Sequence, residues 1–183
     1  MKTVLIFFSV LLFCLPSFSQ NRYFTRTGHV SFNAGTALED IDAFNNAASS
    51  VLDISSGQIE FAVLIKGFEF KRTLMQDHFN ENYMESDKYP KSVFRGKVIN
   101  PDKVSFRKDG TYTVTVRGTL DMHGVSKEIE TTGDLKVMGA TIEANAIFTV
   151  LLSDYNISVP GLVKDKISKS VNITVKCNYA VLK

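Results

Sequence analysis

The chain has 183 residues, 44% of them hydrophobic and 22% charged, and its formal net charge at pH 7 is +2. This length suits a single domain with a hydrophobic core. So small a positive excess gives no reason to expect a nucleic acid as a partner.

The first residues have the pattern of a secretory signal peptide. Lys2 precedes an apolar stretch of about a dozen residues, and Ser17 and Ser19 are small residues at the positions that a signal peptidase reads. We therefore expect residues 1–19 to be removed and the mature domain, residues 20–183, to be exported to the periplasm or secreted. The apolar stretch is shorter than the roughly 20 residues that a membrane-spanning helix needs.

The two cysteines do not suggest lipidation or a disulfide. Cys14 follows Phe13, whereas a lipoprotein signal requires a small residue before its cysteine. Only Cys177 remains after cleavage, so an intramolecular disulfide is excluded. Cys177 falls on the apolar face of the last predicted strand, which indicates a buried, unreactive thiol.

The first half of the domain has an irregular pattern. Residues 28–32 begin a β pattern, and the polar residues 39–46 favour a connection or a short helical turn. Residues 58–70 are typical of a strand with apolar side chains on both faces. Because such a strand needs cover on both sides, we expect another element to lie over its outer face.

The predicted covering element is a short helix over residues 71–85. Leu74, Met75, Phe79 and Tyr83 recur at spacings that form one apolar stripe on a helix. The helix is expected to end before Tyr89-Pro90, because the residue before a proline favours an extended backbone.

The second half alternates apolar and polar residues with a period of two. The pattern covers residues 92–99, 111–122, 128–138, 142–152 and 171–181. Several of these runs exceed the usual strand length of about five or six residues. Long antiparallel strands with one apolar face close into a barrel or a sandwich with that face inside. Tight turns are expected at residues 108–111, 123–124 and 138–140, and the loop at 153–165 is expected to border one end.

Several segments together resemble a known family. They are Asp77-His78-Phe79, Tyr83-Met84, Lys88-Tyr89-Pro90, Phe94, residues 118–128, residues 154–157 and residues 171–173. In this order, behind a signal peptide, they resemble the YceI-like family of exported bacterial proteins over essentially the whole mature chain.

The resemblance implies an all-β fold, a lipocalin-like antiparallel barrel of eight strands. It also implies that the interior binds a long-chain polyisoprenoid or an isoprenoid quinone, which the protein would carry or store. The chain lacks tryptophan, so the Gly-x-Trp plug of true lipocalins is absent, and Asn156 stands where many family members carry glycine.

A barrel of about eight strands has an interior that side chains can just fill or that can hold one guest. Small residues at Gly96, Gly118, Ala144 and Ala146 favour a narrow apolar channel, while a solid core of packed side chains is the open alternative. The cavity lining is expected to comprise Phe61, Val63, Leu74, Phe79, Phe94, Val98, Val114, Val116, Leu120, Ala146, Phe148 and Leu152.

The polar residues do not indicate an enzyme. His29, His78 and His123 lack the local spacing of a zinc site, and no Gly-x-Ser-x-Gly motif is present. We therefore expect no catalytic residue, metal or cofactor. His78 lies beside the apolar stripe of the predicted helix and is a candidate for a hydrogen bond to a lipid head group, or else faces water. His123 is most simply a turn residue.

The expected partner is an apolar lipid, and two other protein classes stay open. Lys164, Lys166 and Lys169 favour either a transient contact with a membrane surface or a solvated loop. The other classes are a structural or stress-related interaction protein with a filled core and a small outer-membrane β-barrel, which would turn its apolar face outward. No pattern indicates an oligomeric state.

Overall fold

The computed structural model describes residues 21–182, so the expected signal peptide lies outside the described residues and stays a prediction. The described chain consists mostly of long strands. They are β1 (Arg22–Gly35), β2 (Asp42–Asp53), β3 (Gln58–Leu64), β4 (Glu69–Phe70), β5 (Lys91–Val98), β6 (Gly110–Met122), β7 (Val125–Met138), β8 (Thr141–Leu151) and β9 (Ile167–Val181).

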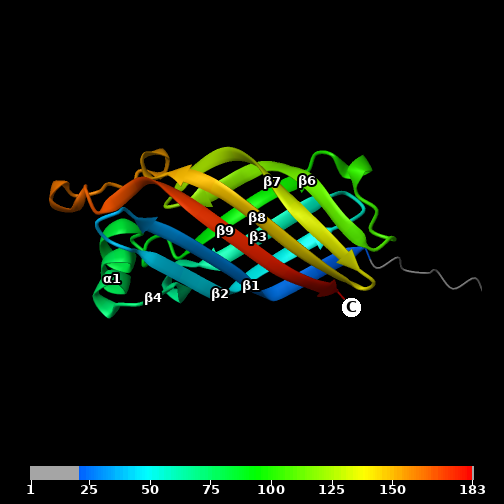
Figure 1. The fold of residues 1–183 in the computed structure, drawn as a ribbon, viewed down its shortest axis with the longest axis horizontal. Coiled ribbons are helices and arrows are strands. Elements are labelled where there is room, and N and C mark those ends of the chain that lie inside the picture. The colour runs from blue at the N-terminus through cyan, green and yellow to red at the C-terminus, as the bar shows by residue number, and fades with distance from the viewer. Residues whose placement is uncertain (1–20, 183) are drawn as a thin grey trace, which may run out of the picture.

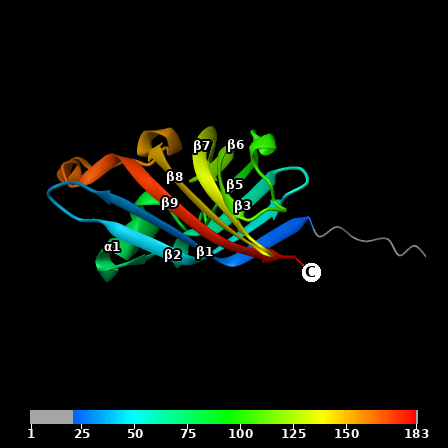
Figure 2. The same cartoon turned by 45° about the vertical axis from the view of Figure 1, so that its right-hand side comes forward.

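Eight of these strands close into an antiparallel barrel (Figures 1 and 2). The order around the wall is β1, β9, β8, β7, β6, β5, β3 and β2, and β1 also pairs with β2, which completes the circle. The two-residue strand β4 is an addition that pairs with the beginning of β2. The predicted all-β, lipocalin-like barrel of about eight strands is confirmed.

The wall carries charged pairs on its outer surface. Arg95 of β5 contacts Glu60 of β3 at 3.3 Å and Asp121 of β6 at 3.0 Å. Arg117 of β6 contacts Glu130 of β7 at 2.6 Å. This arrangement is the reverse of a transmembrane barrel, whose outer band is apolar.

A connection or a short helical turn was expected over residues 39–46. That prediction is wrong, because strand β2 begins at Asp42 and covers most of this segment. The polar residue Asn45 is buried on this strand. Its side-chain amide donates to the carbonyl of Leu64 at 3.0 Å, and its oxygen accepts from the amide of Ala47 at 2.8 Å. Because both polar atoms have partners, an asparagine is tolerated in the interior.

The prediction that residues 58–70 form one strand with apolar side chains on both faces is wrong. β3 ends at Leu64, and the 3₁₀ turn η1 (Ile65–Gly67) interrupts the alternation before β4. After this turn Phe68 and Phe70 face the interior, on the same side as Ile65, whereas Leu64 is exposed to solvent. The outer face of this strand therefore needs no cover.

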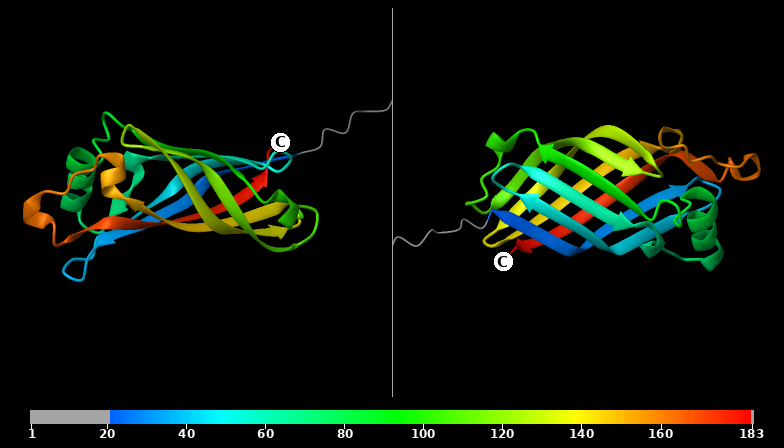
Figure 3. Two further views of the ribbon diagram at one scale, coloured as in Figure 1. Left: turned by 90° about the horizontal axis from the view of Figure 1, so that it is seen from above. Right: turned by 180° about the vertical axis from the view of Figure 1, so that it is seen from behind.

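The predicted helix is present, but it lies across one end of the barrel (Figures 1 and 3) and not over the outer face of β3. α1 (Thr73–His78) continues as the π-helical turn η2 (Phe79–Tyr83). The ring of Phe79 packs against Phe32, Phe68 and Phe70, with ring centroids 5.6, 5.6 and 5.0 Å away.

No helix within residues 21–182 is long and apolar enough to cross a membrane.

The two ends of the barrel differ. One end, here called the floor, is filled by a packed cluster of Tyr23, Leu52, Val98, Val114, Leu135, Val137, Ile142, Cys177 and Tyr179. The other end, here called the mouth, is surrounded by α1, the β1–β2 connection and the β8–β9 loop (Figure 3). The barrel is therefore packed with side chains at the floor, whereas three segments of the chain border its mouth.

Candidate functional site

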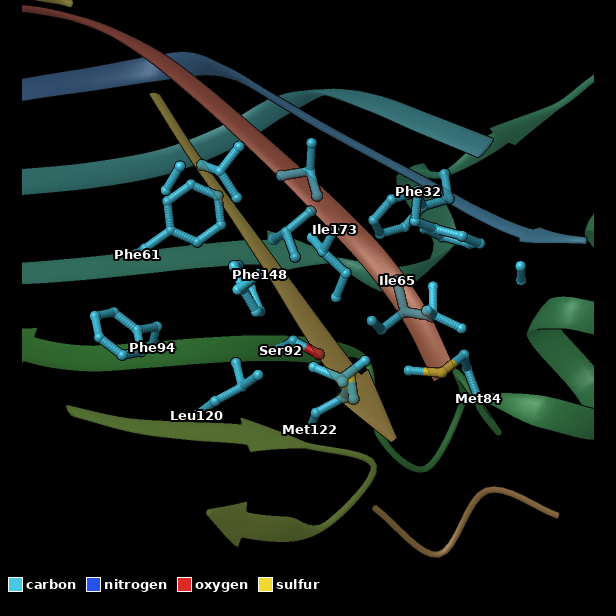
Figure 4. A pocket seen from close by; sticks show the side chains of 18 of the residues that line it. Phe32, Phe61, Ile65, Met84, Ser92, Phe94, Leu120, Met122, Phe148 and Ile173 are labelled. Carbon is cyan, nitrogen blue, oxygen red and sulfur yellow. The ribbon is translucent and has the colours of Figure 1, made fainter. Parts of the chain in front are cut away.

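A cavity of about 550 Å³ extends from the floor to the mouth inside the barrel. This volume falls within the range of about 300–1,000 Å³ that is typical of ligand pockets. Among the barrel strands described, all but β2 contribute to the lining, and the side chains drawn in Figure 4 are nearly all apolar. The alternative of a core filled throughout by side chains is thus not what the structure shows.

Small residues of β7 and β8 make room in the cavity. Gly133, Ala144 and Ala146 line it. Gly96 and Gly118, which were also expected to widen the channel, are not part of the lining. A Cβ on Gly96 would lie 2.5 Å from the ring of Phe94, because that ring covers the glycine.

The polar groups at the floor are satisfied and neutral. Ser50 donates to the carbonyl of Glu60 at 2.8 Å, so the hydroxyl of Tyr179 is the donor in its 2.7 Å contact with Ser50. Burial raises the pKa of the Tyr179 hydroxyl and raises the pKa of the Cys177 thiol to about 11. The prediction of a buried Cys177 is confirmed, and its protonated thiol is a poor nucleophile at neutral pH.

Charged residues hold three segments together at the mouth. Glu39, on the β1–β2 connection, contacts Arg72 just before α1 at 2.5 Å and Lys166 in the β8–β9 loop at 3.1 Å. A hydrogen bond from Arg72, and to a smaller extent one from Lys166, holds the pKa of Glu39 below its ordinary value. We call this group of Glu39, Arg72 and Lys166 the latch.

A hydrogen bond beside the latch joins two of the same segments. The hydroxyl of Thr36 donates to the carbonyl of Asp165 at 2.8 Å. A second ion-pair group lies next to it, where Lys71 contacts Asp40 at 3.4 Å and Asp42 at 3.5 Å. These contacts connect the rim segments with one another around the entrance.

Eleven of the twelve residues expected to line the cavity do so in the structure. They are Phe61, Val63, Leu74, Phe79, Phe94, Val114, Val116, Leu120, Ala146, Phe148 and Leu152. Val98 does not: it belongs to the packed floor, because its inward side chain lies at the closed end of β5. His78 also belongs to the lining, on the helix that crosses the mouth.

The sequence interpretation missed part of the lining. Val30, Phe32 and Ala34 of β1 alternate in a way that could have been recognised, since the pattern matches that of the later strands. The inward residues Val171 and Ile173 of β9 were recognised as an apolar run but were not assigned to the site.

His123 lies at the tight turn predicted between β6 and β7, and it also connects neighbouring loops. Its backbone φ is 50°, in the left-handed region, and Gly124 follows with a φ of 74°. One ring nitrogen lies 2.8 Å from the carbonyl of Tyr155 and the other 2.9 Å from Glu85. These contacts give His123 a structural role, and within residues 21–182 no three His, Cys, Asp or Glu side chains are grouped as a metal site requires.

Asn156 adopts a left-handed backbone, with φ 55° and ψ 27°, after the 3₁₀ turn η4 (Leu152–Tyr155). Asparagine visits this region more readily than most residues other than glycine. The substitution for glycine noted in the sequence therefore leaves this conformation accessible.

The barrel is similar to several solved structures. A polyisoprenoid binding domain from Saccharophagus degradans, implicated in plant cell wall breakdown, has a TM-score of 0.76 at 14% identity, covering 88% of this chain and 99% of that one. BcnA from Burkholderia cenocepacia has a TM-score of 0.69 at 14% identity, covering 84% and 96%. The YCEI protein of Campylobacter jejuni has a TM-score of 0.50 at 16% identity, covering 97% and 98%. At such identities the likeness shows a shared fold.

No curated protein matches the chain. The family profile described as YceI-like domain matches residues 18–179. This match spans the barrel from its first strand to its last, and it confirms the resemblance inferred from the motifs. The chain belongs to the YceI-like domain family.

Proposed function

We propose that this protein binds a long-chain polyisoprenoid or an isoprenoid quinone inside the barrel and carries or stores it outside the cytoplasm. The observation that carries the proposal is the apolar cavity of about 550 Å³, which is closed at the floor and reaches the mouth. Similarity to a polyisoprenoid binding domain and the signal-peptide pattern of residues 1–19 support it.

The hydrophobic effect is sufficient to hold such a ligand without a polar motif. Each buried methylene contributes about 0.8 kcal/mol, so about ten of them contribute on the order of 8 kcal/mol. That free energy corresponds to roughly micromolar binding before the costs of ordering are subtracted. The satisfied polar groups at the floor leave the inner end of the cavity suited to the tail of the lipid.

The experiment is to express the mature chain, residues 20–183, extract it with organic solvent and analyse the extract by mass spectrometry. We expect a prenyl lipid in the extract, or stoichiometric uptake when the empty protein is incubated with one. A protein that is empty after purification and takes up no prenyl lipid would contradict the proposal. An interaction protein whose surface alone acts would give this result.

We further propose that the mouth meets a membrane surface when lipid is exchanged. Leu38, Leu74 and Leu162 have exposed fractions of 72, 65 and 99%, and each lies on a different segment of the mouth. The exposed Lys164 stands on the same loop as Leu162, and the exposed Lys169 follows near the beginning of β9. Apolar side chains flanked by basic ones suit the interface of an anionic bilayer, where each lysine near the surface contributes about 1 kcal/mol.

Removing the exposed leucines is expected to slow exchange. The double substitution Leu38→Ser and Leu162→Ser should reduce transfer of a fluorescent prenyl lipid from phosphatidylglycerol vesicles several-fold, because less apolar surface enters the bilayer. The control is Ile147→Ser, since Ile147 is 66% exposed on the barrel wall. Equal slowing by both proteins would argue against a membrane-facing mouth.

The latch is expected to make lipid release depend on pH. The lowered pKa of Glu39 means that its contacts with Arg72 and Lys166 are complete above about pH 4.5 and are lost as the pH falls through the lowered pKa. Asp40 and Asp42 lie beside it and are paired with Lys71.

We therefore expect the release of bound lipid, followed by fluorescence, to accelerate below about pH 4.5 in the wild-type protein. Glu39→Gln should release lipid several-fold faster at pH 7 and lose most of this pH dependence. Glu143→Gln, which breaks the 3.6 Å pair with Lys136 on the wall, is the control and should leave release unchanged. Unchanged release from Glu39→Gln at pH 7 would show that the latch does not hold the ligand.

A further inference from the structure

Ser92 places an unpartnered hydroxyl in the apolar cavity. It lies near the beginning of β5, in the part of the strand that is closer to the mouth, and only 7% of it is exposed. Figure 4 shows its oxygen among carbon and sulfur atoms, with Ile65, Met84 and Met122 nearby. No hydrogen-bond partner for the Oγ atom is present among the described residues.

This hydroxyl differs from the other polar groups of the interior. Among the described residues, Asn80 Oδ1 and Tyr155 Oη are also buried without a partner, but neither residue belongs to the cavity lining. Thr131 does belong to the lining, and its hydroxyl donates a hydrogen bond to the carbonyl of Ile147 at 3.2 Å. At the floor, the hydroxyl of Tyr179 donates to Ser50, which in turn donates to the carbonyl of Glu60.

A buried hydroxyl without a partner destabilises a protein, because its hydrogen bonds to water are lost and not replaced. An alanine at this position would avoid that cost. A hydroxyl in an otherwise apolar pocket is the kind of polar group that fixes the orientation of a ligand.

We propose that Ser92 donates a hydrogen bond to a neutral oxygen of the bound lipid and so selects oxygen-bearing isoprenoids, such as prenyl quinones, over isoprenoid hydrocarbons. This inference rests on the proposed lipid-binding function. The ring of the lipid then lies just inside the mouth, and its tail extends toward the floor.

The charges around Ser92 favour a neutral group over a phosphate. The cations that belong to the lining, Arg72 and Lys166, are at the rim, where Glu39 already pairs with both. The neighbours of Ser92 in Figure 4 are apolar. An ionised phosphate at Ser92 would lose its hydration without gaining a counter-ion, whereas a quinone carbonyl needs only one donor.

The test compares two ligands with the same tail and the same six-membered carbon ring: a tetraprenyl benzoquinone, and the tetraprenyl benzene that lacks its two carbonyl oxygens. Wild-type protein should bind the quinone about tenfold more tightly. Ser92→Ala should lower quinone affinity about tenfold and leave the affinity for the hydrocarbon within twofold. Ser92→Thr, which retains the hydroxyl, should restore the preference.

Two further measurements separate this role from a structural one. The thermal stability of the empty Ser92→Ala protein should equal or exceed that of the wild type, since an unpartnered hydroxyl has been removed. Thr131→Val, which removes a hydroxyl that already has a partner, should change both affinities by the same factor.

Equal affinities of wild-type protein for the two ligands, or a parallel loss of both in Ser92→Ala, would overturn the inference while leaving lipid binding intact. Failure of the wild type to bind either ligand would overturn the proposed function itself.

Discussion

Replacing Ala146 by phenylalanine is expected to weaken lipid binding at least tenfold while the barrel stays folded. Ala146 lies on β8, lines the cavity and faces Gly133 of β7, so a ring at this position would extend into space that is empty. Displacing only two methylene groups of the ligand costs about 1.6 kcal/mol, which is more than a factor of ten in affinity. Lipid affinity measured by fluorescence titration tests the expectation.

The matched control is Ile147→Phe. Ile147 is the next residue on the same strand, and its side chain lies on the outer wall. Because neighbouring residues of a strand point to opposite faces, the same ring added one position along does not enter the cavity. Lipid affinity that is unchanged in Ala146→Phe would mean that the ligand does not occupy this cavity.

Replacing Gly118 by alanine is expected to destabilise the barrel by about 2–3 kcal/mol, a magnitude typical of overpacking. Gly118 of β6 is paired with Gly96 of β5. A Cβ on Gly118 would lie 2.3 Å from the Cα of Gly96 and 2.3 Å from the carbonyl oxygen of Arg95. Since both of these are backbone atoms, the strands would have to separate.

The control for this prediction is Gly161→Ala in the β8–β9 loop. A Cβ there would meet no atom within 4 Å, so the change in the free energy of unfolding should stay within about 0.5 kcal/mol. The free energies are obtained from urea denaturation. A Gly118→Ala protein as stable as the Gly161→Ala protein would contradict the close strand contact.

The alternation of the second half was enough to predict the strands β5 to β9. One face of each strand is exposed to solvent and the other is turned toward the interior. A shift of the strand register by one residue would therefore exchange the two faces. This makes the pattern strong in sequences such as Tyr112, Val114 and Val116. The motif order then indicated the family, which supplied the number of strands.

The first half of the domain was harder to predict. It departs from regular alternation at several points, and the reason for each departure is a contact between residues that are distant in the chain. In the sequence, Asn45 is typical of a loop. In the structure its side chain is buried in β2, because its amide donates a hydrogen bond to the carbonyl of Leu64. The 3₁₀ turn η1 turns Phe68 and Phe70 toward the interior of the barrel, and the local sequence pattern does not predict this turn. The helix was recognised from its stripe, but its place at the mouth follows from the rings that it meets.

An inward-facing residue is not always a cavity residue, as Val98 illustrates. Val98 and Phe94 share one face of β5, but Val98 is packed at the floor whereas Phe94 borders the cavity. Ser92 gave no signal, because a serine on a strand is ordinary unless its surroundings are known. The latch joins segments that are far apart in the chain, so no spacing could reveal it.

The sequence by itself determined which side chains of the later strands face inward, that the interior is apolar, and to which family the chain is similar. The tertiary structure alone decided where the barrel is solid, where it is hollow and which hydroxyl is left without a partner. The reason is that periodicity depends on neighbouring residues, whereas a cavity is the difference between the space enclosed by eight strands and the summed volume of the side chains within it.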